Sequence, residues 1–306
     1  MSPSSDVARK KKTSFADTLR ALPWILPVLL LIAGVVVYPA GVMIYNSTRK
    51  ISRIGIDKGS AGSDNYIKVI TNPDFGHILL NTFIWVVSVT VITIILSLAL
   101  AQFLDKAFPG RRIVRIAVII PWASSVVMTT TLVYYSLEPK FGYVQQLLYD
   151  LGFTPHLQIG FTKQPLPGFI VAICVAIFVS LPFTTYTILA GMQSIGNDVK
   201  EAAKIDGAGP IRTYFSVILP HLKPAVATAT TINIINVFNN LPILKVLTGA
   251  IPGNKADITT TWMFKMIQQD GHIDWASALS VINFSIIILI IILYMVIVKP
   301  LKGVND

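Results

Sequence analysis

Six long apolar runs constrain the fold of this 306-residue chain more than any other feature of its sequence. Each run approaches the ~20 residues that an α-helix needs to cross the hydrocarbon core of a membrane. The runs lie approximately at Leu22–Tyr45, Leu79–Leu104, Ile113–Leu137, Pro167–Gly191, Pro224–Leu247 and Ala276–Val298. Because only 13% of the residues are charged, against ~25% in soluble domains, the sequence predicts an all-α membrane protein with six transmembrane helices.

Two of the runs contain residues that are costly in lipid. The third carries Arg115 near its start and Pro121 inside it, and the fifth contains four asparagines. We expect both helices to face protein or water, where such groups find partners. The single cysteine, Cys174, lies within the fourth run. It allows no internal disulfide and is expected to be a small buried apolar residue.

The lysines and arginines predict how the helices are oriented. With a cytoplasmic N-terminus, 15 of the 25 basic residues fall in the inner segments, which are also the shorter ones. Positive charge marks the cytoplasmic side, although five basic residues in the first outer loop weaken the bias. We therefore expect a cytoplasmic basic tail at 1–21, a six-helix transmembrane domain at 22–298 and a cytoplasmic tail at 299–306. A cleaved secretory signal is disfavoured, because no A-x-A cleavage site follows the first run.

The segment between the fourth and fifth runs, residues 192–223, is charged and rich in Ala and Gly. It predicts a helix-turn-helix on the cytoplasmic membrane surface. Asp198 is the expected N-cap, with Glu201 three residues later in capping-box spacing. Gly207 supplies a left-handed stop and Pro210 opens a second helix. The residues alone leave two roles open: a connector that packs on its own helices, or a surface on which another protein docks.

The stretch EAAKIDGAGPIRTYFSVILP, at 201–220, resembles the EAA loop of permease subunits of binding-protein-dependent ABC importers. That loop reads EAA, three residues, Gly, nine residues and Ile-x-Leu-Pro, and Val217 here replaces the isoleucine. In the family, this loop forms a coupling helix that docks in a cleft of the ATPase. The resemblance assigns coupling to Glu201, Ala202, Ala203, Asp206, Gly207, Leu219 and Pro220.

The resemblance extends over roughly residues 64–298. Segments such as DNYIKVITNPDFGHILLNTFIWVV, IPWASSVVMTTTLVYYSLEPKFGYVQQLL and SLPFTTYTILAGMQSI are similar to sugar permeases of the maltose and glycerol-phosphate types. So are NVFNNLPILKVLTGAIPGN and DWASALSVINFSII. Two departures blur the expected loop geometry: Gly196 stands where the family often has proline, and Ala250-Ile251 interrupts a usually glycine-rich stretch.

This resemblance implies a transport subunit of a bacterial or archaeal cytoplasmic membrane. The chain would form the path for a sugar or oligosaccharide that an extracytoplasmic binding protein delivers, together with a second related permease. Two separate ATPase subunits would bind ATP and Mg²⁺, so no cofactor, metal or catalytic residue is expected here. No G-x-x-x-x-G-K-[ST] motif occurs in the sequence. The alternative is a permease for a polyol phosphate, an amino acid or a polyamine.

Other classes of protein are less well supported. The four histidines lie in loops or at span ends, and no H-E-x-x-H or G-x-S-x-G motif marks an intramembrane enzyme. A channel or secondary transporter would need ionisable residues within its spans, which are nearly absent. The net charge of +10 is scattered over loops, so we expect contact with anionic lipid and none with nucleic acid.

The fifth run contains the stretch INIINVFNN. At ~100° per residue, Asn233, Asn236 and Asn240 fall within about 60° of one another, and Asn239 lies to one side. Such amides either join neighbouring helices or bind sugar hydroxyls, and the residues alone do not decide between these roles. The resemblance places substrate contacts on this helix and the preceding one. It favours Asn233 and Asn240, with Asn236 beside them and with Ser180 and Phe183 facing them.

Overall fold

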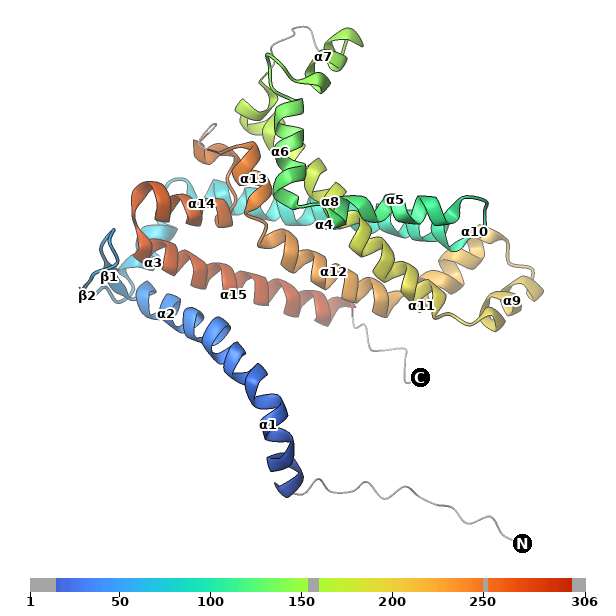
Figure 1. Cartoon of the computed structure of the whole chain (residues 1–306), viewed down its shortest axis with the longest axis horizontal. Coiled ribbons are helices and arrows are strands. Elements are labelled where there is room, and N and C mark those ends of the chain that lie inside the picture. Colours follow the sequence, from blue (N-terminus) through green and yellow to red (C-terminus); the bar gives the residue numbers. More distant parts are fainter. Residues whose placement is uncertain (1–14, 154–159, 250–252, 299–306) are drawn as a thin grey trace.

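Helices dominate the structure, a computed structural model that describes residues 15–153, 160–249 and 253–298 (Figure 1). The longer ones are α1 (Phe15–Ile32), α2 (Tyr38–Ser47), α4 (Phe75–Asp105), α5 (Arg111–Ala123), α6 (Val126–Ser136), α8 (Pro165–Gln193), α12 (Lys223–Phe238) and α15 (Ile273–Val298). The shorter ones are α3 (Asp64–Ile70), α7 (Tyr143–Asp150), α9 (Asn197–Ile205), α10 (Pro210–Thr213), α11 (Leu219–His221), α13 (Pro242–Leu247) and α14 (Thr259–Lys265). Two short antiparallel strands, β1 (Arg49–Ile51) and β2 (Asp57–Ser60), follow α2.

Four helices in the described part of the chain are long and apolar enough to cross a membrane. They are Pro23–Ser47, Phe75–Asp105, Pro165–Gln193 and Ile273–Val298. These match the first, second, fourth and sixth predicted spans. The first helix begins at Phe15, inside the predicted tail at 1–21. Residues 1–14 and the predicted tail at 299–306 lie outside the described residues.

The bundle is built around α4, which packs on α8 and α12, while α12 also packs on α15 (Figure 1). Trp85 of α4 and Phe169 of α8 are buried in its core, with ring centroids 5.9 Å apart. Helix α1 stands away from the bundle, and α2 packs against α15. Cys174 is exposed on α8, so the predicted burial is wrong. A membrane helix is apolar on all sides, and an apolar run therefore does not reveal its inward face.

The third predicted span, Ile113–Leu137, is wrong as one straight helix. Helix α5 ends at Ala123 and α6 begins at Val126, and the two are bent by 91°. Pro121 lacks the N–H of a regular helix, and Ser124 and Ser125 are extended, with ψ of 150° and 130°. The backbone N–H and the hydroxyl of Ser124 both donate to the Ile120 carbonyl, at 3.1 and 3.0 Å, where α5 ends. With this pair counted as one span, the described residues hold up to five candidate spans.

The fifth predicted span, Pro224–Leu247, is also broken. Helix α12 has 16 residues, fewer than the ~20 that a span needs, and α13 starts at Pro242. Proline cannot supply the N–H that a continuous helix would donate to the Phe238 carbonyl. Instead, Thr260 Oγ1 donates to the Phe238 carbonyl at 3.0 Å, and Trp85 Nε1 donates to the neighbouring Val237 carbonyl at 2.9 Å. Buried non-helical backbone is tolerated in a membrane protein when its polar groups are satisfied in this way.

Replacing the fully buried Trp85 by phenylalanine is expected to lower the free energy of unfolding by about 1–3 kcal/mol, because the smaller ring loses the Nε1–H bond and leaves a cavity in the core. The hydrogen-bond part of this loss is limited, because the Asn240 backbone N–H also donates to the Val237 carbonyl, at 3.2 Å. Thermal unfolding of the detergent-solubilised protein measures the change. The matched control is Trp24→Phe, because Trp24 is 83% exposed on α1. Equal melting temperatures for the two variants would show that neither the packing nor the hydrogen bond of the buried indole stabilises the fold.

Candidate functional site

A cavity of about 390 Å³ lies between α8, α12 and the bend that joins α5 to α6. Asn233, Asn236 and Asn240 line it from α12 and the turn that follows. Ser180 and Phe183 line it from α8. The structure thus brings together the five residues predicted for the substrate path, because the ~100° helical spacing places the asparagines on one face. Their role in binding substrate stays a prediction.

Hydrogen bonds distinguish the three asparagines. Asn233 is buried, donates to Thr184 Oγ1 at 3.1 Å and accepts from Thr90 Oγ1 at 3.4 Å. Its amide therefore joins α12 to α8 and α4. Asn240 is half-buried and accepts from the Ile243 backbone N–H at 3.3 Å, at the start of α13. Asn236 is exposed. The amides of Asn236 and Asn240 are thus the ones most accessible from the cavity.

Sequence reasoning missed the aromatic wall of the cavity. Trp122, at the end of α5, stacks on Phe183 with ring centroids 6.3 Å apart and planes 30° from parallel. Trp122 is 58% exposed, so part of its ring is free to meet a ligand. The signal was the aromatic residue directly after Pro121, but only the bend between α5 and α6 turns it toward α8. The other lining residues are Val126, Val179 and Thr184, so no described residue that lines the cavity is charged.

The segment 192–223 forms the predicted helix-turn-helix at one end of the bundle (Figure 1). Gly207 has the predicted left-handed conformation, with φ of 73°. The backbone N–H groups of Gly207 and Ala208 donate to the Lys204 and Ala203 carbonyls, both at 3.0 Å, which closes the end of α9. Pro210 opens the second helix, α10, as predicted. It continues through a π-helical segment, Tyr214–Ile218, into α11.

The predicted N-cap at Asp198 is wrong. Helix α9 starts at Asn197, with the extended residue Gly196 as its N-cap and no side-chain capping bond. The Asp198 carboxylate lies where a side chain on Gly196 would be. Glycine at this position therefore lets the acidic residue fold back inside the first turn, where it faces the positive end of the helix dipole.

The residues assigned to coupling are mostly accessible. Ala203 is buried and Leu219 is half-buried, whereas the other five are exposed: Glu201, Ala202, Asp206, Gly207 and Pro220. Large apolar side chains that the motif did not identify are exposed beside them. Ile205 is 86% exposed, Ile211 76% and Phe215 61%. This surface offers apolar and charged groups together, as docking surfaces do.

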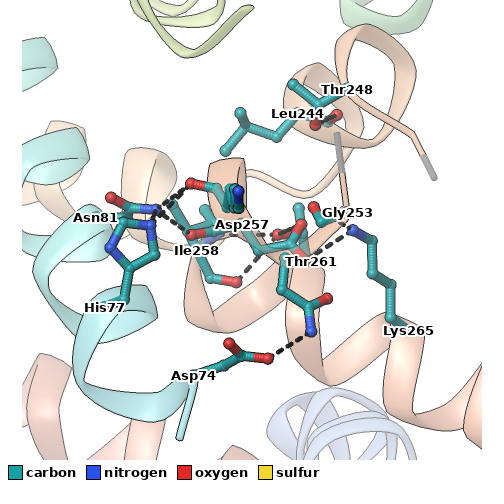
Figure 2. Close-up of polar contacts among 12 residues, drawn as sticks. Asp74, His77, Asn81, Leu244, Thr248, Gly253, Asp257, Ile258, Thr261 and Lys265 are labelled. Carbon is teal, nitrogen blue, oxygen red and sulfur yellow. Dashed lines mark hydrogen bonds and ion pairs between the residues drawn. The ribbon is translucent and has the colours of Figure 1, made fainter. Parts of the chain in front are cut away.

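A polar cluster at the opposite end of the bundle was not predicted either. It joins the start of α4 to residues 253–265, which we call the hairpin segment (Figure 2). Lys265 and Asp257 form an ion pair of 2.7 Å, and the Asp257 side chain is only 1% exposed. Lys265 Nζ also donates to the Gly253 carbonyl at 3.1 Å, and Thr261 donates to Asp257 at 2.9 Å. Burial raises the pKa of Asp257 above its ordinary value, and the bond from Lys265 opposes that rise.

Two relatives and one solved structure are similar to this chain over most of its length. A probable ABC transporter permease protein of Brucella suis is 32% identical over 277 residues, covering 90% of this chain and 96% of the relative. The trehalose/maltose transport system permease protein of Thermococcus litoralis is 28% identical over 275 residues, covering 89% and 90%. The fold matches a chain in the crystal structure of a bacterial alginate ABC transporter in complex with an alginate pentasaccharide-bound periplasmic protein. There the TM-score is 0.82 at 20% identity, with 95% of this chain and 99% of that chain covered.

One protein family accounts for nearly the whole chain. The family described as the binding-protein-dependent transport system inner membrane component matches residues 7–302. This match confirms the resemblance inferred from the EAA stretch. The chain belongs to this family of membrane permease components of ABC transporters.

Proposed function

We propose that the chain forms one half of the translocation path of an ABC importer for a sugar or oligosaccharide. A second, related permease completes the path, an extracytoplasmic binding protein delivers the sugar, and two separate ATPase subunits bind ATP and Mg²⁺. The α9–α11 segment couples ATP hydrolysis to transport. Both termini are cytoplasmic, and the chain lies in a bacterial or archaeal cytoplasmic membrane.

The observation that favours a sugar as the substrate is the cavity, which is uncharged and lined by amides. Amides both donate and accept hydrogen bonds, as sugar hydroxyls do. The rings of Trp122 and Phe183 supply the apolar surface that ligand pockets commonly have. A glycerol phosphate, an amino acid or a polyamine would bring a charge into a cavity whose described lining offers no opposite charge. Such burial is costly without a partner, so this alternative is less well supported.

The test is uptake by vesicles that contain the full complex with its binding protein. A panel of neutral mono-, di- and oligosaccharides is compared with glycerol phosphate, amino acids and spermidine. We expect ATP-dependent uptake of at least one sugar and of no charged solute. Uptake of a charged solute alone would reject the sugar proposal.

Orientation gives a separate prediction. In a Cys174→Ser background, a cysteine at Ser194 should react with a membrane-impermeant maleimide only from the cytoplasmic side, and one at Lys163 only from outside. Both positions are exposed, and they flank the two ends of α8, so they should report opposite sides. The expected contrast rests on the distribution of lysine and arginine. Reversed labelling would reject the proposed coupling role of α9, because that helix would face away from ATP.

A further inference from the structure

Helix α4 runs the length of the bundle, from the hairpin segment at one end to α9 at the other (Figure 1). It has 31 residues, Phe75–Asp105, which at 1.5 Å per residue is about 46 Å. It contains no proline, and its one glycine, Gly76, is the second residue. Proline and interior glycine are the usual sites of helix kinks. Helix α4 is therefore suited to move as one rigid element.

The N-terminal end of α4 contacts the hairpin segment through hydrogen bonds (Figure 2). Asn81 is only 8% exposed and donates to two backbone carbonyls, that of Lys255 at 3.1 Å and that of Asp257 at 3.0 Å. Next to it in the chain, Thr82 Oγ1 accepts from the Thr259 backbone N–H at 2.9 Å. Because the Asp257–Lys265 pair fixes the hairpin segment internally, a displacement of Asn81 would move the segment as a unit.

The other end of α4 contacts α9. Asp105, the last residue of α4, pairs with Lys200 of α9 at 3.3 Å, and about a quarter of each side chain is exposed. Ala101 and Leu104 of α4 lie in the buried apolar cluster against which Val199 of α9 packs. Arg115 Nη2 donates to the Leu104 carbonyl at 3.0 Å and so satisfies the end of the helix.

The middle of α4 packs on α12, one of the helices that line the cavity. Thr90 donates to Asn233, and Trp85 holds the broken end of α12. One rigid helix thus has directional contacts with three places: the helix assigned to coupling, a residue that lines the cavity, and the hairpin segment. A rigid body that touches separate sites in this way is a physical basis for coupling between them.

We propose that α4 carries displacements of α9 to the hairpin segment, with Lys200 and Asn81 as the positioning residues at its two ends. This inference rests on the proposed coupling role of α9. Neither residue contacts the transported solute in this proposal. Each fixes the position of a neighbouring element relative to α4.

The test measures the hairpin segment in the assembled complex, with binding protein, sugar and lipid present. In the Cys174→Ser background, a cysteine at the exposed Lys255 is labelled with a maleimide, without nucleotide and with nucleotide trapped by vanadate. We expect the two labelling rates to differ by about fivefold or more, the lower end of ordinary allosteric coupling. Lys200→Glu should bring this ratio close to one. Asn81→Ala should lower it at least about twofold, because the His77 contact with the Lys255 carbonyl and the Thr82–Thr259 bond remain.

Charge reversal distinguishes positioning from a general loss of structure. Adding Asp105→Lys to Lys200→Glu restores the opposite charges and should restore the parent ratio. The matched control is Lys106→Glu, which makes the same charge change beside Asp105 at an exposed residue and should keep the ratio. An unchanged ratio in Lys200→Glu and Asn81→Ala, no rescue by Asp105→Lys, or an equal rate with and without nucleotide in the parent would overturn the proposal.

A further variant separates this inference from the proposed function. Glu201→Lys disturbs the exposed face of α9 and should uncouple ATP hydrolysis. If that variant stays fully coupled, the proposed coupling role of α9 fails. If it uncouples while Lys200→Glu and Asn81→Ala keep the parent ratio, only the role of α4 fails.

Discussion

Glu201→Lys is expected to reduce the stimulation of ATP hydrolysis by the sugar-loaded binding protein by at least about tenfold, within the usual range of coupling between sites. Glu201 is exposed on α9, whereas Ala203 is buried on the bundle side of the same helix. The substitution therefore reverses a charge on the surface proposed to dock without disturbing the packing of α9. Membrane insertion, assembly with the second permease and basal ATP hydrolysis should persist.

Gly207→Trp tests the same surface by shape. Gly207 has φ of 73°, and nothing lies within 4 Å of the position that a Cβ atom would take there. A tryptophan would therefore be strained by its backbone and would project into the docking surface. We expect the same loss of stimulation. The control for the charge change in Glu201→Lys is Glu138→Lys. Glu138 is the one other glutamate of the sequence and lies outside 192–223. Full stimulation in both loop variants would show that the segment only connects α8 to α12.

The sequence predicts best what depends on local pattern. Four spans follow from the length of their apolar runs, and Gly207 takes its left-handed conformation because a helix ends there. The grouping of the cavity asparagines follows from helical spacing alone. In each of these cases, the neighbours along the chain decide the outcome.

The sequence predicts poorly what depends on distant partners. The fifth run breaks before Pro242, and the break is tolerated because Trp85, Thr260 and the Asn240 backbone N–H donate to the carbonyls at the end of α12. The bonds from Asn81 to the hairpin segment join residues more than 170 positions apart. Hydropathy records neither kind of contact. For the same reason, Pro121 stood out in the sequence as unusual within the third run, but the sequence did not predict the 91° bend that places Trp122 at the cavity.

Asn233 shows how a correct grouping can hide a difference in role. The resemblance favoured Asn233 and Asn240 as sugar contacts, and both line the cavity. Each end of the Asn233 amide, however, already makes one interhelical bond, to Thr184 or to Thr90. Interhelical bonds of this kind contribute ~0.6 kcal/mol each in membrane proteins. We therefore expect Asn233→Leu to lower the stability of the assembled complex by about 1 kcal/mol, in addition to any effect on transport.

Asn236→Leu and Asn240→Leu are expected to lower sugar transport by about 5- to 150-fold, because a buried hydroxyl that loses its partner costs about 1–3 kcal/mol. Leucine has the same branched arrangement of side-chain heavy atoms as asparagine, so it replaces each amide with a group of similar shape that neither donates nor accepts. The complexes should still assemble and hydrolyse ATP, because Asn236 is exposed and Asn240 makes one half-buried backbone bond.

The matched control is Asn239→Leu, between the two positions in the sequence. Asn239 is exposed, bonds to the Ile235 carbonyl of its own helix, and lines a different cavity, between α12 and α15. The same chemical change there should leave transport within about twofold of the parent, as expected for a substitution away from the site. Initial rates of labelled-sugar uptake by vesicles compare the three variants. If Asn239→Leu lowers transport as much as the other two, or if Asn236→Leu and Asn240→Leu fail only because the subunits separate, the amides join helices and the sugar binds elsewhere.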